Sequence, residues 1–149
     1  YPARFDSLQQ AAEAMWAIST SFGPHTQQQW LELSKPMLRS LPDGGLTLHY
    51  DPAIAVPFRA LTQEAAAAGE SVLWQLYDQI QAQTLLLRGA QSDLLSPETA
   101  QAMQVRGPKA HCVEFEGVGH APTLIAADQV AVVQNFLLAA PVAESALAG

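Results

Sequence analysis

The feature that most constrains the fold is a strand–helix–strand–helix order in the second half of the chain. Residues 84–88 form a short apolar run closed by Gly89, which has the length and apolar content of a buried strand. Residues 111–115 are predicted to form a second strand of the same length. Between them, Ser96 and Pro97 form a helix start, with serine as N-cap and proline in the first turn. Strands separated by a helical crossover predict a parallel sheet and an α/β fold.

The composition is that of a folded, acidic domain. Hydrophobic residues make up 49% of the 149 residues and charged residues 14%, which argues against a disordered chain. The net charge of −7 disfavours nucleic acid as a partner, because phosphate backbones repel it. No apolar run has the length of a transmembrane helix, so we expect no membrane partner. The single cysteine, Cys112, permits no intrachain disulfide and favours a reducing, cytoplasmic location.

The first half of the chain, residues 1–80, shows mainly helical patterns. Ser7 and Thr26 each have a glutamine three residues later, which is the capping-box pattern, and apolar residues with helical spacing follow both. A third helix is predicted over 71–80, with its apolar face turned inward. The segment 46–50, which follows an Asp-Gly-Gly turn signal, is predicted to be a short strand.

Two residues that can cooperate chemically follow the predicted parallel strands. Asp93 lies a few residues after the first strand, and His120 lies a few residues after the second. Because parallel strands joined by a crossover point the same way, their carboxyl ends share one sheet edge, where ligands bind in open α/β sheets. A carboxylate beside an imidazole fixes its tautomer and stabilises the imidazolium that forms when the ring takes a proton. The pair is therefore predicted to be the acid–histidine half of a hydrolytic triad.

Simpler interpretations exist for these and other polar residues. An aspartate is common in turns, and a histidine can be bonded to backbone alone. We expect His25 and His49 to be solvated and Cys112 to be a small core residue. No Cys/His pair has the spacing of a zinc site, so no metal site is expected, and the hydrolase hypothesis stated below implies no organic cofactor.

The segments around the aspartate and the histidine resemble the α/β-hydrolase family. Residues 85–93, LLLRGAQSD, resemble the strand and turn that deliver the family's triad acid. Residues 117–122, GVGHAP, resemble the loop that delivers its histidine. The family's chain order of nucleophile, acid and histidine agrees. The resemblance implies that residues 81–149 are the C-terminal portion of an α/β-hydrolase fold, with parallel strands and crossover helices.

The same resemblance implies that residues 1–80 are the mainly helical cap that precedes the acid-bearing strand in this family. Caps supply part of the substrate pocket, so aromatic side chains of this region are candidates for substrate binding, although tryptophans at helical spacing are more often core residues. The candidates are Trp30, Trp74 and Tyr77, with Trp16 and Phe58 as further ones.

The chain lacks the family's nucleophile. No serine lies in a Gly-x-Ser-x-Gly elbow, and the oxyanion-hole loop and the first strands of the sheet are missing too. We therefore expect part of a longer hydrolase, inactive as this chain alone, in which His120 is the general base and Asp93 orients it. The expected substrate is a small organic molecule, such as an ester, an epoxide, a haloalkane or a diketone with a cleavable C–C bond.

A second hypothesis is a non-catalytic interaction module. A half-sheet leaves an unpaired edge strand, and such an edge tends to pair with another chain. Two copies could cover each other's exposed edge. This hypothesis therefore predicts a homodimer, whereas the hydrolase hypothesis predicts a small-molecule substrate as the partner.

Overall fold

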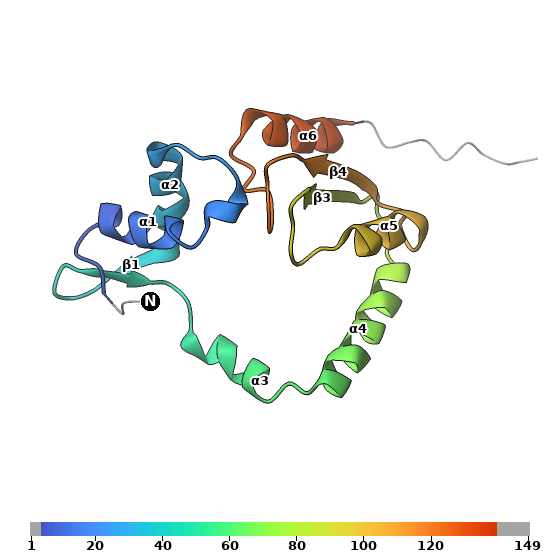
Figure 1. Ribbon diagram of the computed structural model, residues 1–149, viewed down its shortest axis with the longest axis horizontal. Coiled ribbons are helices and arrows are strands. Elements are labelled where there is room, and N and C mark those ends of the chain that lie inside the picture. The colour runs from blue at the N-terminus through green and yellow to red at the C-terminus, as the bar shows by residue number, and fades with distance from the viewer. Residues whose placement is uncertain (1–3, 140–149) are drawn as a thin grey trace, which may run out of the picture.

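The computed structural model describes residues 4–139, which form two lobes joined by a helical connection (Figure 1). The N-terminal lobe contains α1 (Leu8–Trp16), η1 (Thr20–Phe22), α2 (Gln27–Ser34), η2 (Lys35–Met37), β1 (Leu38–Ser40) and β2 (Leu46–Leu48). The connection contains η3 (Pro52–Ala55), α3 (Val56–Arg59) and α4 (Gln63–Asp78). The second lobe, called here the sheet lobe, contains β3 (Leu85–Gly89), α5 (Pro97–Val105), β4 (His111–Phe115) and α6 (Ala127–Leu138).

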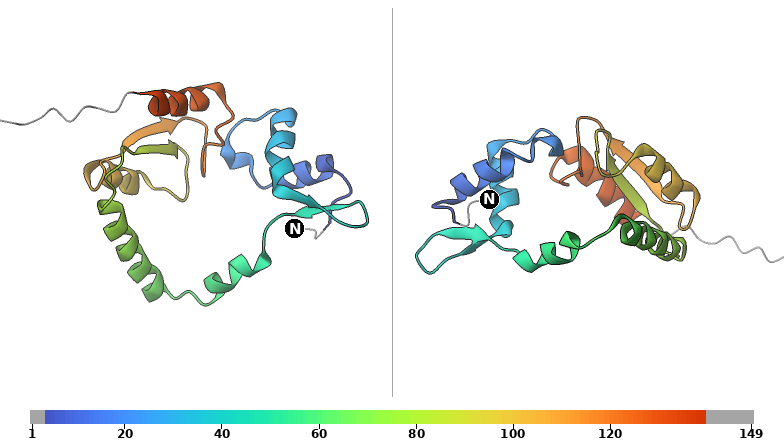
Figure 2. Two further views of the ribbon diagram at one scale, coloured as in Figure 1. Left: turned by 180° about the vertical axis from the view of Figure 1, so that it is seen from behind. Right: turned by 60° about the horizontal axis from the view of Figure 1, so that its bottom comes forward.

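The strand pair of the sheet lobe confirms the parallel arrangement predicted from the sequence. Leu85 lies opposite His111 and Gly89 lies opposite Phe115, so β3 and β4 run in register over their full length. The crossover helix α5 begins as predicted, with the Ser96 hydroxyl accepting a hydrogen bond from a first-turn backbone N–H. Figures 1 and 2 show α5 and α6 on opposite sides of this strand pair.

The N-terminal lobe begins its two helices at the predicted caps. The Ser7 side chain accepts from a first-turn N–H of α1, and Thr26 forms a complete capping box at α2. The small core of the lobe is built around Phe5, Ala11 and Met15. The backbone of Phe5 is hydrogen-bonded to β2, so the chain before α1 adds a bridge to the hairpin.

The hairpin β1–β2 departs from the sequence prediction. The predicted strand over 46–50 is present as β2, but its antiparallel partner β1 lies in a segment that was expected to be helical. Pro36 lies in the 3-10 turn η2, because a proline cannot continue the hydrogen bonding of an α-helix. Asp43 then accepts a hydrogen bond from the Gly45 N–H and stabilises the turn between the strands.

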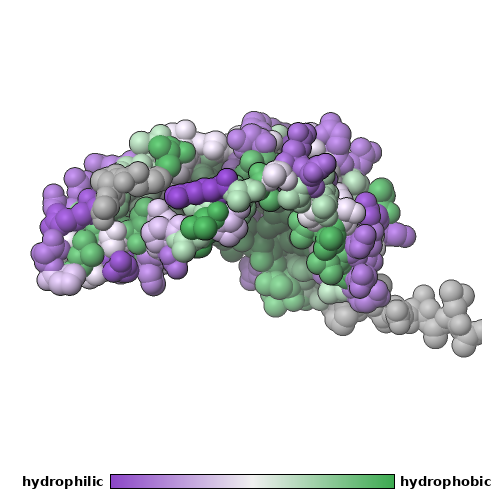
Figure 3. Space-filling view, turned by 90° about the horizontal axis from the view of Figure 1, so that it is seen from below, coloured by the Kyte–Doolittle hydropathy of each residue, from purple (hydrophilic) through white to green (hydrophobic). Residues whose placement is uncertain are grey.

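The helix α4 is longer and more exposed than predicted. It begins at Gln63, where the Thr62 hydroxyl caps it, rather than at residue 71. Most of its expected inward side chains are exposed in this chain; Leu73, for example, has an exposed fraction of 67%, whereas Tyr77 is half-buried and bonded to α5. The described residues leave most of this face uncovered, and Figure 3 shows apolar side chains on this side of the molecule. An uncovered apolar helix face is where a further part of a fold or a second protein can pack.

None of the helices in residues 4–139 combines the length and the apolar character needed to cross a bilayer. The last helix of the predicted strand–helix–strand–helix order, expected from the sequence over 128–140, is present as α6, which begins at Ala127 and ends at Leu138, while residue 140 lies outside the described residues.

Candidate active site

Asp93 and His120 lie at the same edge of the parallel strand pair. Asp93 follows the end of β3 at Gly89 by four residues, and His120 follows the end of β4 at Phe115 by five. Gly89 and Phe115 are cross-strand partners, so both loops leave the sheet at one level. Both side chains are exposed. The carboxyl edge of a parallel sheet is the usual place for a ligand in α/β folds.

The two loops that carry these residues are bonded to each other beyond the strands. The Gln91 N–H donates to the Val118 carbonyl oxygen at 3.0 Å, and the Ser92 hydroxyl donates to the His120 carbonyl oxygen at 3.3 Å. At Gly89 a Cβ atom would overlap the Val118 carbonyl oxygen. The close approach of the loops therefore requires glycine at the end of β3.

The Asp93 carboxylate and the His120 ring are not joined by a hydrogen bond in the part of the chain that the structure describes. The His120 ring instead contacts the ring of Phe22 edge-on, with the ring centroids 5.5 Å apart. Catalytic hydrogen bonds are often long or misaligned before substrate binds. The structure thus brings both residues to one edge, and their direct pairing stays a prediction.

Arg88, a residue that the sequence analysis missed, holds the loop that bears Asp93. Its side chain has an exposed fraction of 3%, and its Nε donates to the Leu95 carbonyl oxygen at 2.8 Å. Its Nη1 donates to Glu114 at 3.0 Å and to the Ala90 carbonyl oxygen at 3.4 Å. One guanidinium therefore ties both ends of the loop to the sheet. The signal available in the sequence was a charged residue at the end of an apolar run.

The loop that bears His120 is also bonded to the N-terminal lobe. The Gly119 N–H donates to the Ser21 carbonyl oxygen. The His25 Nδ1 lies 2.8 Å from the Gly23 carbonyl oxygen, and its Nε2 lies 2.6 Å from the Thr123 hydroxyl. Because a carbonyl only accepts, Nδ1 carries the proton, and Nε2 of a neutral ring accepts from the hydroxyl. The expectation that His25 is solvated is therefore wrong, since both of its nitrogens are bonded within the protein.

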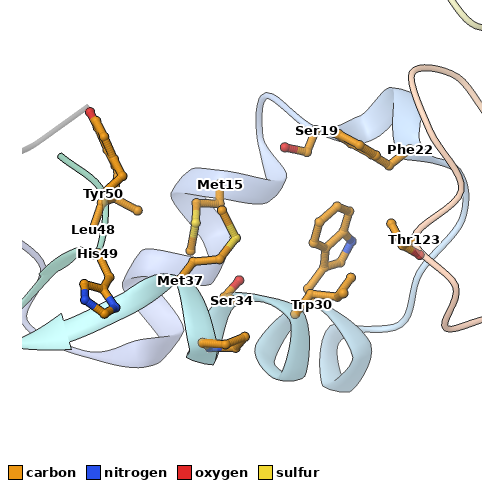
Figure 4. Close-up of a pocket in the computed structure, with 12 residues that line it drawn as sticks. Met15, Ser19, Phe22, Trp30, Ser34, Met37, Leu48, His49, Tyr50 and Thr123 are labelled. Atoms are coloured by element: carbon orange, nitrogen blue, oxygen red, sulfur yellow. The ribbon is translucent and has the colours of Figure 1, made fainter. Parts of the chain in front are cut away.

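A cavity of about 610 Å³ lies in the N-terminal lobe beside the loop that bears His120 (Figure 4). Its walls are mostly apolar and include Trp30, which was predicted to bind substrate. Phe22 lines this cavity and contacts the His120 ring, and Thr123, three residues after His120, lines it as well. The cavity is therefore within one side chain of the histidine, which is where a substrate pocket would have to lie.

The other two candidates for substrate binding, Trp74 and Tyr77, lie elsewhere, on α4. They contact each other edge-on, and the Tyr77 hydroxyl donates to the Met103 carbonyl oxygen on α5 at 2.7 Å. The Arg106 guanidinium lies over the Trp74 ring, 4.3 Å from its centroid. The two aromatic rings thus help to hold α4 against α5, and their part in substrate binding stays a prediction.

Two further observations limit the chemistry of the described residues. Burial raises the pKa of the Cys112 thiol, and the neighbouring Glu114 carboxylate raises it further, so little thiolate forms at neutral pH. This agrees with the structural role expected for that cysteine. Within residues 4–139, no group of three or more His, Cys, Asp or Glu side chains could hold a metal ion.

Comparison with known proteins gives one clear sequence relative. No family model matches the chain. The chain is 44% identical over 142 residues to the 3-hydroxybutyrate-oligomer hydrolase of Cupriavidus necator. The match covers 93% of this chain and 48% of that protein. The chain thus spans about half the length of the curated relative that it matches.

Solved structures give the same picture of a partial match. An alpha/beta hydrolase from Novosphingobium aromaticivorans is 31% identical with a TM-score of 0.72, over 90% of this chain and 46% of that one. A putative hydrolase from Rickettsia typhi has a TM-score of 0.71 at 24% identity, over 90% of this chain and 43% of that one. The M. tuberculosis esterase Rv0045c has a TM-score of 0.62 at 19% identity, over 90% and 42%. The last two show likeness of fold alone.

Proposed function

We propose that this chain, which has the C-terminal portion of an α/β-hydrolase fold and is related to that superfamily, supplies the acid and the histidine of a hydrolytic active site. The parallel pairing of β3 and β4 carries the proposal, because Asp93 and His120 follow the carboxyl ends of these two neighbouring strands. The bonds between their loops support it further, since they hold the two residues at one edge.

In this proposal His120 is the general base and Asp93 orients its ring. His120 takes the proton of an attacking hydroxyl, from a serine nucleophile or from the water that cleaves an ester intermediate, and then returns a proton to the leaving oxygen. Asp93 stabilises the imidazolium formed in between. The nucleophile comes from residues other than these 149, because no Gly-x-Ser-x-Gly elbow occurs among them.

Of the substrate classes predicted from the sequence, an ester has the strongest support. The relative at 44% identity is described as a hydrolase of 3-hydroxybutyrate oligomers, which are short oligoesters. The mostly apolar cavity of about 610 Å³ beside His120 has the size of a pocket for a small organic molecule. We therefore propose a small hydroxyalkanoate ester as the substrate. Residues 1–80 then act as the cap that lines its pocket, and the single cysteine favours a cytoplasmic location.

The test is ester hydrolysis by the full-length protein that carries this chain, with p-nitrophenyl butyrate and the 3-hydroxybutyrate dimer as substrates. The substitutions Asp93→Asn and His120→Ala should each lower kcat by about a thousandfold or more. His111→Ala is the matched control, because His111 is exposed at the other end of β4. Normal kcat in His120→Ala would contradict the proposed role.

A second candidate function, a module that pairs with another copy of the chain, is favoured by the exposed apolar face of α4. Light scattering after size exclusion decides between the two. A concentration-independent dimer that dissociates on Leu73→Lys would support self-association through this face. A monomeric and catalytically active full-length protein would contradict it.

A further inference from the structure

One buried donor in the cavity beside His120 has no partner. Among the described residues, the indole Nε1 of Trp30 is the buried side-chain polar atom without a hydrogen bond. The side chain of Trp30 has an exposed fraction of 6%, so water does not reach the N–H freely. Buried polar groups are nearly always satisfied in native proteins, and a donor that is not satisfied indicates a missing acceptor.

The neighbours of Trp30 fix its ring without satisfying its N–H. Trp16 stacks on the ring at a centroid distance of 5.8 Å, and His25 lies 4.7 Å from it. Figure 4 shows the nitrogen edge of the ring turned toward Thr123. The Thr123 hydroxyl is hydrogen-bonded to His25 Nε2 at 2.6 Å and makes no hydrogen bond with the Trp30 N–H. The ring is therefore held in place, while its donor has no acceptor among the described residues.

The surroundings of this donor indicate what kind of acceptor it would take. The cavity that Trp30 lines is mostly apolar, with Met15, Phe22, Met37 and Leu48 among its walls. The lining also includes side chains that can accept a hydrogen bond, but none of them is bonded to the Trp30 N–H; these are Ser19, Ser34, His49, Tyr50 and Thr123. A plain alkyl chain would fill such a cavity and leave the N–H unpaired. A hydroxyalkanoate chain carries a hydroxyl or an ester carbonyl along its length, and either oxygen can accept from an indole N–H.

We propose that the Trp30 indole N–H donates a hydrogen bond to an oxygen within the hydroxyacyl chain of the substrate, and that this bond selects oxygenated chains over plain alkyl chains. The inference rests on the proposed function and deepens it. A site built around a buried donor discriminates strongly against an analogue that lacks the acceptor, because binding that analogue leaves the donor unpaired. Trp30 is thus a specificity-determining residue in the cavity that is also lined by Phe22, a contact of His120.

The kinetic test compares Trp30→Phe with wild type in the full-length protein. This substitution keeps an aromatic ring against Trp16 and removes the donor. We expect the ratio of kcat/KM for the 3-hydroxybutyrate dimer to kcat/KM for p-nitrophenyl butyrate to fall by about tenfold or more. Trp74→Phe, which removes an indole N–H outside this cavity, is the matched control and should change that ratio little. An equal loss for both substrates in Trp30→Phe would overturn the inference while leaving the proposed hydrolase function intact.

A binding test keeps the two proposals separate and does not need an active enzyme. The indole N–H resonances of the ¹⁵N-labelled full-length protein are followed during titration with 3-hydroxybutyrate and, separately, with butyrate. The signal that is missing from Trp30→Phe is assigned to Trp30. A saturable downfield shift of that signal with 3-hydroxybutyrate but not with butyrate supports the inference, even if no ester is hydrolysed. No shift, or the same shift with both acids, overturns it.

Discussion

Phe22 stands edge-on to His120, with a ring-centroid distance of 5.5 Å and an interplanar angle of 71°. The contact joins the N-terminal lobe to the loop after β4, and the bond from Gly119 to Ser21 lies beside it. The orientation of the imidazole therefore depends on a residue that is 98 positions earlier in the chain as well as on the sheet. The proposed base and the proposed pocket share this one aromatic side chain.

Replacing Phe22 should affect catalysis more than folding. We expect Phe22→Ala to lower kcat on p-nitrophenyl butyrate by about tenfold, because a ring left free to turn spends less time in the reactive orientation. Phe22→Leu should retain more activity. Phe58→Ala is the control, since the Phe58 side chain is 69% exposed on α3. Equal activity in Phe22→Ala and Phe58→Ala would contradict the positioning role.

Alanine substitutions at Gly89 and at Gly69 should change the free energy of unfolding in opposite directions. At Gly89 the added Cβ meets the carbonyl oxygens of the loop that bears His120, so Gly89→Ala should lower the free energy of unfolding by several kcal/mol, roughly 2 or more. Gly69 lies within α4 with open space around it, so Gly69→Ala should raise that free energy by about 0.5–1 kcal/mol. Urea denaturation of the full-length variants measures both. A tolerated alanine at Gly89 would mean that the loops approach less closely.

Even the conservative substitution Arg88→Lys should destabilise the protein. A lysine cannot reproduce both the Nε bond to Leu95 and the Nη1 bonds to Glu114 and Ala90, so at least one of these partly buried acceptors loses its donor. We expect Arg88→Lys to lower the free energy of unfolding by about 1–3 kcal/mol. The exposed Arg39 on β1 offers a matched substitution, and Arg39→Lys should lie within about 0.5 kcal/mol of wild type. Similar values for the two variants would show that the Arg88 bonds are dispensable.

The ion pair between Asp78 and Arg106 should make the junction of α4 and α5 sensitive to acid. The hydrogen bond from Arg106 holds the pKa of the Asp78 carboxyl below its usual value, against a smaller opposing effect of burial. The unfolded chain therefore binds this proton more readily than the folded one. The stabilisation is present above the usual pKa of an aspartate and is lost as the pH falls through the lowered pKa of Asp78.

Melting temperatures between neutral pH and pH 2 test this dependence. The difference in Tm between wild type and Asp78→Asn should be largest near neutral pH and should shrink in acid. Arg106→Gln should give the same trend, because it removes the same pair. A constant difference across the pH range would show that the carboxylate does not contribute through its charge.

The elements that local signals define were predictable, and those that depend on distant partners were not. The helix caps at Ser7, Thr26 and Ser96 and the two apolar runs act over a few residues, so the sequence predicts α1, α2, α5, β3 and β4 correctly. The carboxyl-edge location of Asp93 and His120 follows from the parallel crossover rule alone. The strand β1 was missed because three residues, Leu38–Ser40, carry no periodic pattern of their own.

The contacts that form the cavity could not be predicted from the sequence. His25 and Thr123 are bonded across 98 positions, and nothing near either residue predicts the other. Trp30 was selected as an aromatic residue of the expected cap, but its unsatisfied N–H is visible only once its neighbours are placed. For α4, the helical spacing of apolar residues predicts an apolar face. The same spacing does not predict which element covers that face, and most of it is exposed in this chain.

Segment 21–25 is bonded to the loop that bears His120, so the segments of the first half of the chain differ in how freely their sequence can change. In the proposed hydrolase, a change within 21–25 alters the position of the imidazole and therefore lowers turnover. The exposed stretch from 51 to 62 makes no such connection in the described residues and can accept insertions at small cost. The cavity walls contributed by α2 and the hairpin are less constrained than 21–25. Under the proposed function, substitutions in those walls can change the substrate range without changing the acid and the histidine at the sheet edge.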